Sequence, residues 1–450
     1  MAGSASERGE AEPPPTRSGL FALGSLAMLA GLGTGLVGAL FRLALEQANR
    51  FRDALIVRAD AWGIGGFLLV VALAGSATAL AAWLVRRVAP SASGSGIPRV
   101  MAVLEGDAPP APMRVVPVKF LAGTLAIGSG PALGREGPTV QMGASIAYQI
   151  GAMLRRDWAD CRTLMAAGAG AGFAVAFNAP IAGALFVVEG LLKRFEPRLA
   201  VAALASSAVA IWVGRWLSGG ASEFTLAPLR QPGLDHLSFF LLLGVAAGLA
   251  GTLYNRTLLG ALGLAGRWPG LAVEWRAAMV GAAIGAAAWF APSLVGGGDA
   301  LAQQALRGEG TLMVLPVLFL FRLGLIACSV AAGAPGGLLV PFLALGAELG
   351  LWIGLLCALL FPGLAFEPTG FALVGMAALF TAIVRTPLTA MVLVTEMTAS
   401  DTLLLPMMAA CFAALLVATL FDERSILDVL KERAFTRQTG TGPAPPDAKT

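Results

Sequence analysis

The sequence predicts an all-α polytopic membrane protein with two related halves. Hydrophobic residues make up 57% of the 450 positions and charged residues only 13%. The mean hydropathy of +0.78 means that most of the chain lies in lipid or against other apolar helices. Residues 1–18 and 433–450 are rich in Pro, Gly, Thr and charge, and are expected to be disordered tails. The membrane domain is therefore expected over 19–432.

Apolar stretches that can form helices recur throughout this domain. Several contain Gly and Pro or are shorter than the roughly 20 residues that a clean membrane span needs, which predicts half-helices lining a cavity inside the bilayer. The expected helices are 19–48, 63–85, 115–133, 138–154, 164–192, 199–216, 237–264, 276–292, 312–332, 338–361, 370–396 and 402–421.

A weak internal repeat predicts that the two halves, 19–216 and 237–422, have the same plan. With an offset of 203, several small residues and prolines recur, and Lys119 falls on Arg322. With an offset of 207, Glu189 falls on Glu396. The further matches are Gly130, Gly134, Pro138, Gly143 and Ala144 on Gly333, Gly337, Pro341, Gly346 and Ala347, then Gly168, Phe173, Pro180 and Val187 on Gly375, Phe380, Pro387 and Val394.

Charge and cysteine patterns exclude several other classes. The net charge of +4 comes from short basic clusters between apolar runs, which are typical of membrane flanks and not of nucleic-acid binding. The four cysteines are scattered without metal-ligand spacing, so we expect no disulfide framework, metal or cofactor. The polar N-terminus lacks the order of a cleaved signal peptide, so the first apolar run is expected to anchor the chain.

Three glycine-rich segments each precede or open an apolar helix: 94–98, 134–138 and 333–337. Glycine allows the backbone to approach a ligand closely, and the free N–H groups at a helix start attract an anion. Three such helix starts together predict a dehydrated anion site without a full positive charge, which suits conduction. The alternative for each segment is close helix packing through small residues.

Glu136 is the strongest single functional candidate. A carboxylate beside helix-start N–H groups resembles the anion that those groups bind, so it can plug the site, and protonation would release it. A structural ion pair with Arg135 is the alternative. Arg135 itself is expected to be a structural or field-setting cation more than a ligand.

These motifs together closely resemble the CLC family of chloride channels and proton/chloride antiporters, of the prokaryotic type without paired C-terminal regulatory modules. The resemblance covers about 20–430 and is specific because the motifs are long and ordered. They are Gly94 to Pro98, Val116 to Phe120, Gly134 to Gln141, Phe177 to Pro180, Gly333 to Gly337 and Arg385 to Thr389.

The resemblance implies a fold of two inverted repeats, a homodimer with one pore per subunit, and an inner-membrane location. Glu136 would be the outer gating glutamate, and Ser95 would favour chloride over nitrate. The anion-binding positions that we expect are Gly94, Ser95, Gly96, Ile97, Gly134, Arg135, Gly137, Leu338, Leu339 and Leu427.

Three departures from the family pattern bear on proton coupling. Gly190 stands where proton-coupled relatives carry an inner glutamate, Leu339 stands where an aromatic is usual, and Leu427 stands where an inner-gate tyrosine is expected. Glu189 is the remaining candidate for an inner proton acceptor, although its repeat partner Glu396 equally indicates a structural role for both, capping or pairing near a helix end.

We therefore expect chloride transport gated by Glu136 with weak or no proton coupling, as in a channel. The alternative is a coupled proton/chloride antiporter that uses Glu189 or water as the inner relay. The protein is not expected to be an enzyme, because an intramembrane serine protease at Ser129 would need a base and the only histidine, His236, falls in the polar connector. A non-transporting scaffold is a third class.

Overall fold

The computed structural model describes residues 17–220, 222–267, 270, 272–421 and 424–439. Within these residues every regular secondary-structure element is a helix, and the one β-type pairing is an isolated bridge between Gly134 and Gly337. This confirms the all-α prediction. Six of the described helices are long and apolar enough to cross a membrane by length and composition.

In the described part of the chain, each half contains eight α-helices in the same order. The first half comprises α1 (Arg17–Asp60), α2 (Ile64–Val88), α3 (Ile97–Glu105), α4 (Val115–Gly128), α5 (Glu136–Met153), α6 (Trp158–Phe177), α7 (Pro180–Leu185) and α8 (Pro197–Ser218). The second comprises α9 (Leu237–Gly266), α10 (Val273–Phe290), α11 (Asp299–Leu306), α12 (Val314–Ala331), α13 (Leu339–Leu360), α14 (Pro368–Val384), α15 (Pro387–Thr398) and α16 (Leu404–Leu420). A final helix, α17 (Ile426–Thr439), follows.

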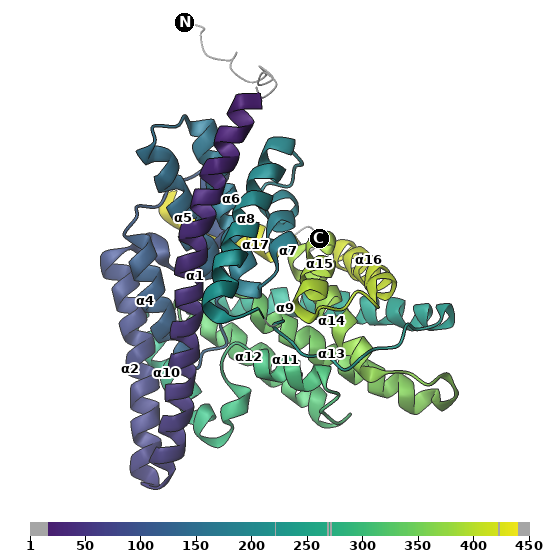
Figure 1. Cartoon of the computed structure of the whole chain (residues 1–450). Helices are drawn as coiled ribbons and strands as arrows, with labels where there is room; N and C mark the ends of the chain where they lie inside the picture. Colours follow the sequence, from purple (N-terminus) through teal and green to yellow (C-terminus); the bar gives the residue numbers. More distant parts are fainter. Residues whose placement is uncertain (1–16, 221, 268–269, 271, 422–423, 440–450) are drawn as a thin grey trace, which may run out of the picture.

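The helices of the two halves pack in matching pairs. α5 packs on α6 as α13 packs on α14, and α1 packs on α8 as α9 packs on α16. Across the halves α2 packs against its own counterpart α10, and α2 also packs against the long helix α1 (Figure 1). α1 has 44 residues and is therefore about 66 Å long. That length exceeds a bilayer core, so α1 must tilt or project from it.

Glycines bring the paired helices into close contact in both halves. A Cβ atom at Gly143 would lie 2.2 Å from the carbonyl oxygen of Gly168, and one at Gly346 would lie 2.6 Å from that of Gly375. Small residues allow such an approach in membrane bundles. The glycines that match in the sequence repeat thus carry the same α5–α6 and α13–α14 contact.

Reciprocal contacts show that the repeats are related by a two-fold axis. Gly134 donates its N–H to the Gly337 carbonyl at 2.9 Å, and Gly337 donates to the Gly134 carbonyl at 2.6 Å. Because these residues are repeat partners, the exchange of identical bonds is the mark of an isologous pair. The predicted two-fold repeat is therefore present inside one chain.

Two predicted helices are each broken into two. The expected helix 164–192 divides at Asn178, whose backbone is left-handed at φ 54°, and continues as α7 and the π-helical turn η2 (Phe186–Leu191). The expected helix 370–396 divides at Arg385, at φ 70°. In both cases a proline two residues later opens the next helix, because proline is favoured in a first turn and disfavours helix just before it.

Smaller differences concern the ends and the short helices. α1 runs twelve residues beyond the expected end at 48, and α3 and α11 were not among the expected helices. Short 3₁₀ turns precede them at η1 (Pro90–Ala92) and η4 (Pro292–Leu294), and others lie at η3 (Leu234–His236) and η5 (Pro362–Leu364). α17 continues to Thr439, into the expected tail from 433, whereas 1–16 and 440–450 lie outside the described residues.

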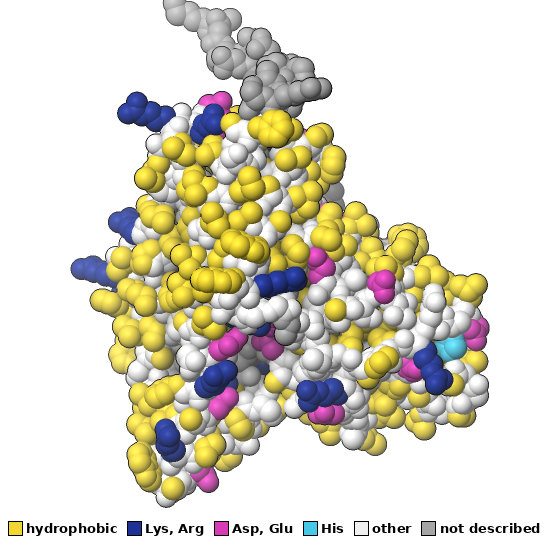
Figure 2. Space-filling view, in the orientation of Figure 1, with side chains coloured by type: hydrophobic (Ala, Val, Ile, Leu, Met, Phe, Trp, Pro, Cys, Tyr) yellow, Lys and Arg dark blue, Asp and Glu magenta, His cyan; other side chains and the backbone are white. Residues whose placement is uncertain are grey.

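The outer surface is apolar over much of its area. α1 exposes Leu29, Leu32, Leu36 and Leu40, each 41–47% accessible and spaced by three or four residues. This spacing makes one helical stripe suited to lipid. Figure 2 shows hydrophobic side chains densely over the upper part of the visible face, with several acidic and basic side chains near its centre.

Candidate functional site

The three predicted glycine-rich segments meet at one place in the structure. The bridge between Gly134 and Gly337 brings the starts of α5 and α13 together, and Gly336 donates its N–H to the carbonyl of Gly94 at 3.3 Å. Gly94 and Gly96 have φ of 62° and 93°, which residues with side chains rarely adopt. The convergence expected from the sequence is therefore present.

Glu136 lies fully buried where these segments converge. Its Oε1 accepts the backbone N–H of Leu339, the first residue of α13, at 2.5 Å. Its Oε2 is buried without a hydrogen-bond partner. A carboxylate oxygen thus occupies the position at a helix N-terminus that suits an anion.

Gly134 and Gly337 make room for this carboxylate. A Cβ atom at either position would lie 2.0 Å from an oxygen of Glu136. Neither residue has a positive φ, so the requirement for glycine at these positions is steric and not conformational. The two glycines of the bridge therefore form the walls of the Glu136 site.

Ser95 adds a hydroxyl beside the start of α5. Its Oγ is buried without a hydrogen-bond partner, and a Cβ atom at Gly137 would lie 2.5 Å from it. Ile97, the first residue of α3, is also fully buried. The geometry places a polar oxygen without a protein partner next to the N-terminal turns of α3 and α5.

Leu338, Leu339 and Leu427 are all buried. Leu338 and Leu339 lie at the start of α13, and Leu339 supplies its amide to Glu136. Leu427 lies on α17, which packs against α3 and α14. Their side chains offer only apolar atoms, so any binding of an anion here depends on backbone N–H groups.

Arg135 is held by two contacts, neither of them with Glu136. Its Nε donates to the Ala176 carbonyl at 2.8 Å, and its Nη2 pairs with Glu223. The second oxygen of Glu223 lies 2.9 Å from Nη1 of Arg42 on α1. A structural Glu136–Arg135 ion pair is not among the contacts of Arg135.

Glu189 and Glu396 each cap the start of a helix in the opposite half of the chain. Glu189 accepts the N–H groups of Leu388 and Thr389 at 3.0 and 2.7 Å, at the start of α15. Glu396 accepts those of Ile181 and Ala182 at 3.1 and 2.8 Å, at the start of α7. This is the structural role left open for the pair, and it engages both oxygens of each carboxylate.

The segment around Gly190 has little room for a longer side chain. Gly190 lies in η2, and a Cβ atom there would lie 2.8 Å from the ring of Phe186. A glutamate at this position would have to displace that fully buried ring. The local packing therefore accommodates glycine at position 190 and leaves no room for glutamate.

Glu223 and Tyr254 were not predicted as part of this region. Tyr254 of α9 is buried, its hydroxyl has no hydrogen-bond partner, and its ring packs edge-on against Phe342 in the first turn of α13. Its hydroxyl is within electrostatic range of Glu136. Neither residue belongs to a glycine-rich motif, so no local sequence signal marks them.

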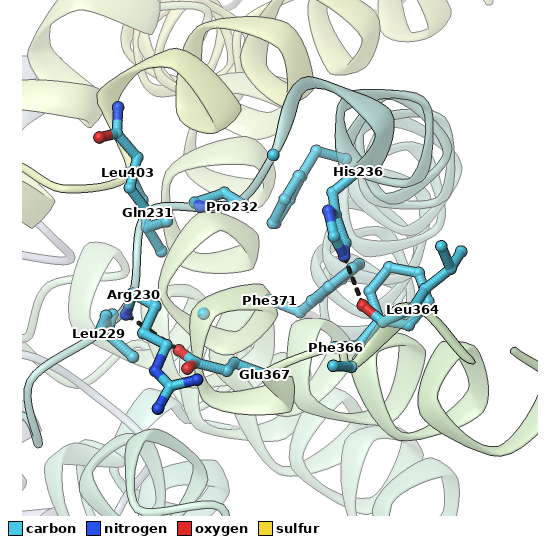
Figure 3. A pocket seen from close by; sticks show the side chains of 14 residues that line it. Leu229, Arg230, Gln231, Pro232, His236, Leu364, Phe366, Glu367, Phe371 and Leu403 are labelled. Atoms are coloured by element: carbon cyan, nitrogen blue, oxygen red, sulfur yellow. Dashed lines mark hydrogen bonds between the residues drawn. The ribbon is translucent and has the colours of Figure 1, made fainter. Parts of the chain in front are cut away.

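A cavity of about 200 Å³ lies away from this site, between the connector and the start of α14 (Figure 3). His236 lines it, with Nε2 2.7 Å from the Leu364 carbonyl and Nδ1 3.2 Å from Asp235. Ser129 instead contacts Thr78 at 3.1 Å. The histidine and the serine therefore do not form a nucleophile and base, and the protease alternative fails.

Comparisons with known proteins cover nearly the whole chain. The family model described as "Voltage gated chloride channel" matches residues 77–419. The H(+)/Cl(-) exchange transporter ClcA of Vibrio cholerae is 37% identical over 423 residues, which cover 92% of this chain and 90% of the relative. ClcA of Cronobacter sakazakii is 36% identical over 434 residues, covering 94% and 92%.

Solved structures agree in fold. The crystal structure of a slow cyanobacterial Cl-/H+ antiporter has a TM-score of 0.89 and 34% identity, and the match covers 93% of this chain and 99% of that one. A eukaryotic CLC transporter has a TM-score of 0.79 at 24% identity, over 92% of this chain and 74% of its own. Proteins of this kind are integral membrane transporters and not enzymes, in keeping with the inner-membrane location expected from the sequence. The converging helix starts, the internal two-fold repeat and these matches show that the chain belongs to the voltage gated chloride channel (CLC) family.

Proposed function

We propose that this protein exchanges chloride for protons across the membrane, with Glu136 as both gate and proton carrier. The observation that carries the proposal is the hydrogen bond from the Leu339 amide to the buried Glu136 carboxylate at the meeting point of three helix starts. An anion and this carboxylate would compete for the same N–H groups. Protonation weakens the carboxylate as an acceptor, so proton uptake and anion binding are linked at one site.

The expectation of weak or absent proton coupling is wrong. It rested on Gly190 and Leu427, where relatives carry side chains that serve a proton and an anion. Curated relatives with 36–37% identity are nevertheless named H(+)/Cl(-) exchange transporters. The similar cyanobacterial structure is also described as a Cl-/H+ antiporter. The chain is accordingly proposed as a coupled antiporter and not as a channel.

The anion path in this proposal uses the backbone more than side chains. Ser95 contributes its hydroxyl, and the N-terminal turns of α3, α5 and α13 contribute N–H groups without a full charge. Such binding is weak enough for an ion to leave quickly. The buried Ser95 hydroxyl without a protein partner supports this assignment.

The inner half of the proton path needs a carrier other than residue 190. Glu189 and a chain of water molecules are the two candidates. Both oxygens of Glu189 already accept hydrogen bonds from α15, which favours water. A side chain that caps a helix would have to break these bonds to move a proton.

The reversal potential of purified protein in liposomes tests the function. The chloride gradient is held fixed while a pH gradient is imposed. A coupled exchanger shifts its reversal potential with the pH gradient, whereas a reversal potential pinned at the chloride value would refute the exchange. Heat-denatured protein in matched liposomes controls for leak.

A homodimer with one pore per subunit is part of the same proposal. The family resemblance supports the homodimer. One pore per subunit is supported by the complete set of three converging segments within each chain. Cross-linking in liposomes at low protein density checks the assembly. A species that remains monomeric while transporting at full rate would contradict it.

A further inference from the structure

We propose that Glu223 is a positioning residue that neutralises and fixes Arg135 beside the gate, so that chloride passes without being trapped there. The inference rests on the proposed chloride transport and assigns a task to the connector between the two halves. Glu223 lies in this connector, and its side chain is only 7% exposed. It bridges Arg135, which precedes the gating residue, and Arg42 on α1.

The guanidinium of Arg135 is held from two directions. Its Nε donates to the Ala176 carbonyl at the end of α6, and its Nη2 donates to Glu223. Arg42 reaches the other oxygen of Glu223 at 2.9 Å and Glu46 at 3.2 Å. A planar guanidinium bound at two edges has a fixed orientation.

Glu223 is the carboxylate in direct contact with Arg135. Its other oxygen pairs with Arg42, so one negative charge lies between two guanidinium groups. Glu136 and Asp299 also act on Arg135 electrostatically, but from a greater distance. Removing Glu223 would leave an excess positive charge beside the residue where an anion must bind and leave.

The charge of Glu223 persists at the pH where transport is measured. Burial alone would raise the pKa of Glu223, but the charges of Arg135 and Arg42 outweigh burial and hold that pKa below its usual range. Because the folded-state pKa is depressed, the ion pairs stabilise the protein above the unfolded-state pKa. This contribution is lost only as the pH falls through the folded-state value. Neutralisation of Arg135 therefore does not switch near pH 7.

Glu223→Gln is expected to change chloride affinity and turnover in the same direction. The freed guanidinium binds chloride more tightly, so KM for chloride falls by about three- to tenfold and the maximal rate falls with it. A residue that only stabilised the fold would lower the amount of active protein and leave KM unchanged. The measurement is the chloride dependence of flux in liposomes, normalised to folded protein.

Glu46→Gln is the matched control. It removes the same charge from another partner of Arg42, but Glu46 is on the same helix, 39% exposed, and its contact is with Arg42. We expect KM to stay within twofold of the wild type. Equal KM values for Glu223→Gln and Glu46→Gln would overturn the proposal.

Two further variants keep the test decisive if Glu223→Gln does not fold. Arg42→Gln removes one cation and leaves Glu223 paired with Arg135, so KM should rise instead of fall. Glu223→Asp keeps the charge and should restore a KM near the wild type. A fall in KM for Arg42→Gln would refute the idea that excess positive charge beside Arg135 traps chloride. Chloride KM is measurable whether or not the wild type couples to protons, so the two proposals fail independently.

Discussion

The two halves of this protein have the same frame but different residues at the Glu136 site. Glu189 and Glu396 exchange equivalent caps, and Gly134 and Gly337 exchange equivalent hydrogen bonds. Glu136 begins α5, whereas its counterpart at an offset of 203, Leu339, begins α13. One half supplies the carboxylate and the other supplies the amide that binds it.

The two helix starts are related by symmetry, whereas the ionisable side chain between them comes from one half only. A two-fold frame brings two helix starts face to face, which creates a site with positive potential from both sides. Two glutamates there would repel each other in a buried space. A single glutamate on a symmetric frame can be held by the opposite helix and released by a proton.

The same frame carries a second difference, in its buried cations. Lys119 donates to the carbonyls of Ala92 and Gly94 at 2.9 and 2.7 Å. Its counterpart Arg322 donates to those of Leu294 and Gly296 at 3.0 and 2.9 Å. Different side chains thus anchor equivalent loops before α3 and α11, so the repeat conserves the task of the residue and not its identity.

Glu136→Leu would make the first residue of α5 the same as that of α13, and we expect the largest effect from it. Without an ionisable group at the gate, proton transport should fall by about a hundredfold or more. Chloride flux should persist because the backbone N–H groups remain. Paired proton and chloride flux assays in liposomes measure both. Leu339→Ile, which keeps the amide, is the control, and proton transport surviving in Glu136→Leu would disprove the role of the carboxylate.

Gly134→Ala and Gly337→Ala test the walls of the site. Each new methyl group would fall 2.0 Å from an oxygen of Glu136, so each variant should be destabilised by about 1–3 kcal/mol. Denaturant unfolding in detergent measures this loss. Gly324→Ala, where nothing lies within 4 Å, should be neutral or slightly stabilised.

A double-mutant cycle tests whether the Glu136 side chain causes the loss of stability in the two glycine variants. The nearest atoms to either new methyl group belong to Glu136, so the penalty should largely disappear in a Glu136→Ala background. A penalty that stays unchanged in that background would mean that the bridge, and not the carboxylate, requires glycine.

The convergence of the three glycine-rich segments on Glu136 was predictable because its sequence signals are local. Glycine and proline define where a helix starts, and a charged residue at such a start in an apolar chain is conspicuous. The same reasoning could have placed the breaks at Asn178 and Arg385, since each lies two residues before a proline. The two long helices expected here are wrong because the apolar character of the sequence continues across both prolines, although each proline opens a new helix.

Other parts of the site could not be read from the sequence. Glu223 is an ordinary acid in a polar connector, and its partners Arg42 and Arg135 are 181 and 88 residues away along the chain. Tyr254 lies in an apolar helix where a ring normally serves packing. Long-range contacts of single residues leave no periodic pattern, so only the fold brings these residues to the Glu136 site.

Glu189→Ala and Glu396→Ala separate helix capping from proton relay. Each removes one of two equivalent caps, so each should lose about 0.5–2 kcal/mol of stability. If water is the inner relay, the proton-to-chloride ratio should stay the same in both variants. A ratio that drops in Glu189→Ala but not in Glu396→Ala would instead make Glu189 the relay. Each variant thus serves as the matched control of the other.

Tyr254→Phe is expected to have the smallest effect, because it removes one hydroxyl and keeps the ring against Phe342. A buried hydroxyl without a partner is unfavourable by about 1–3 kcal/mol, so the variant should be slightly more stable in chloride-free buffer. Thermal unfolding with gluconate in place of chloride measures the change. Tyr148→Phe, at a partly exposed site, should leave stability unchanged. A loss of stability in Tyr254→Phe would contradict an unpartnered hydroxyl, and it would mean that the second half binds the gate through a side chain as well as through its backbone.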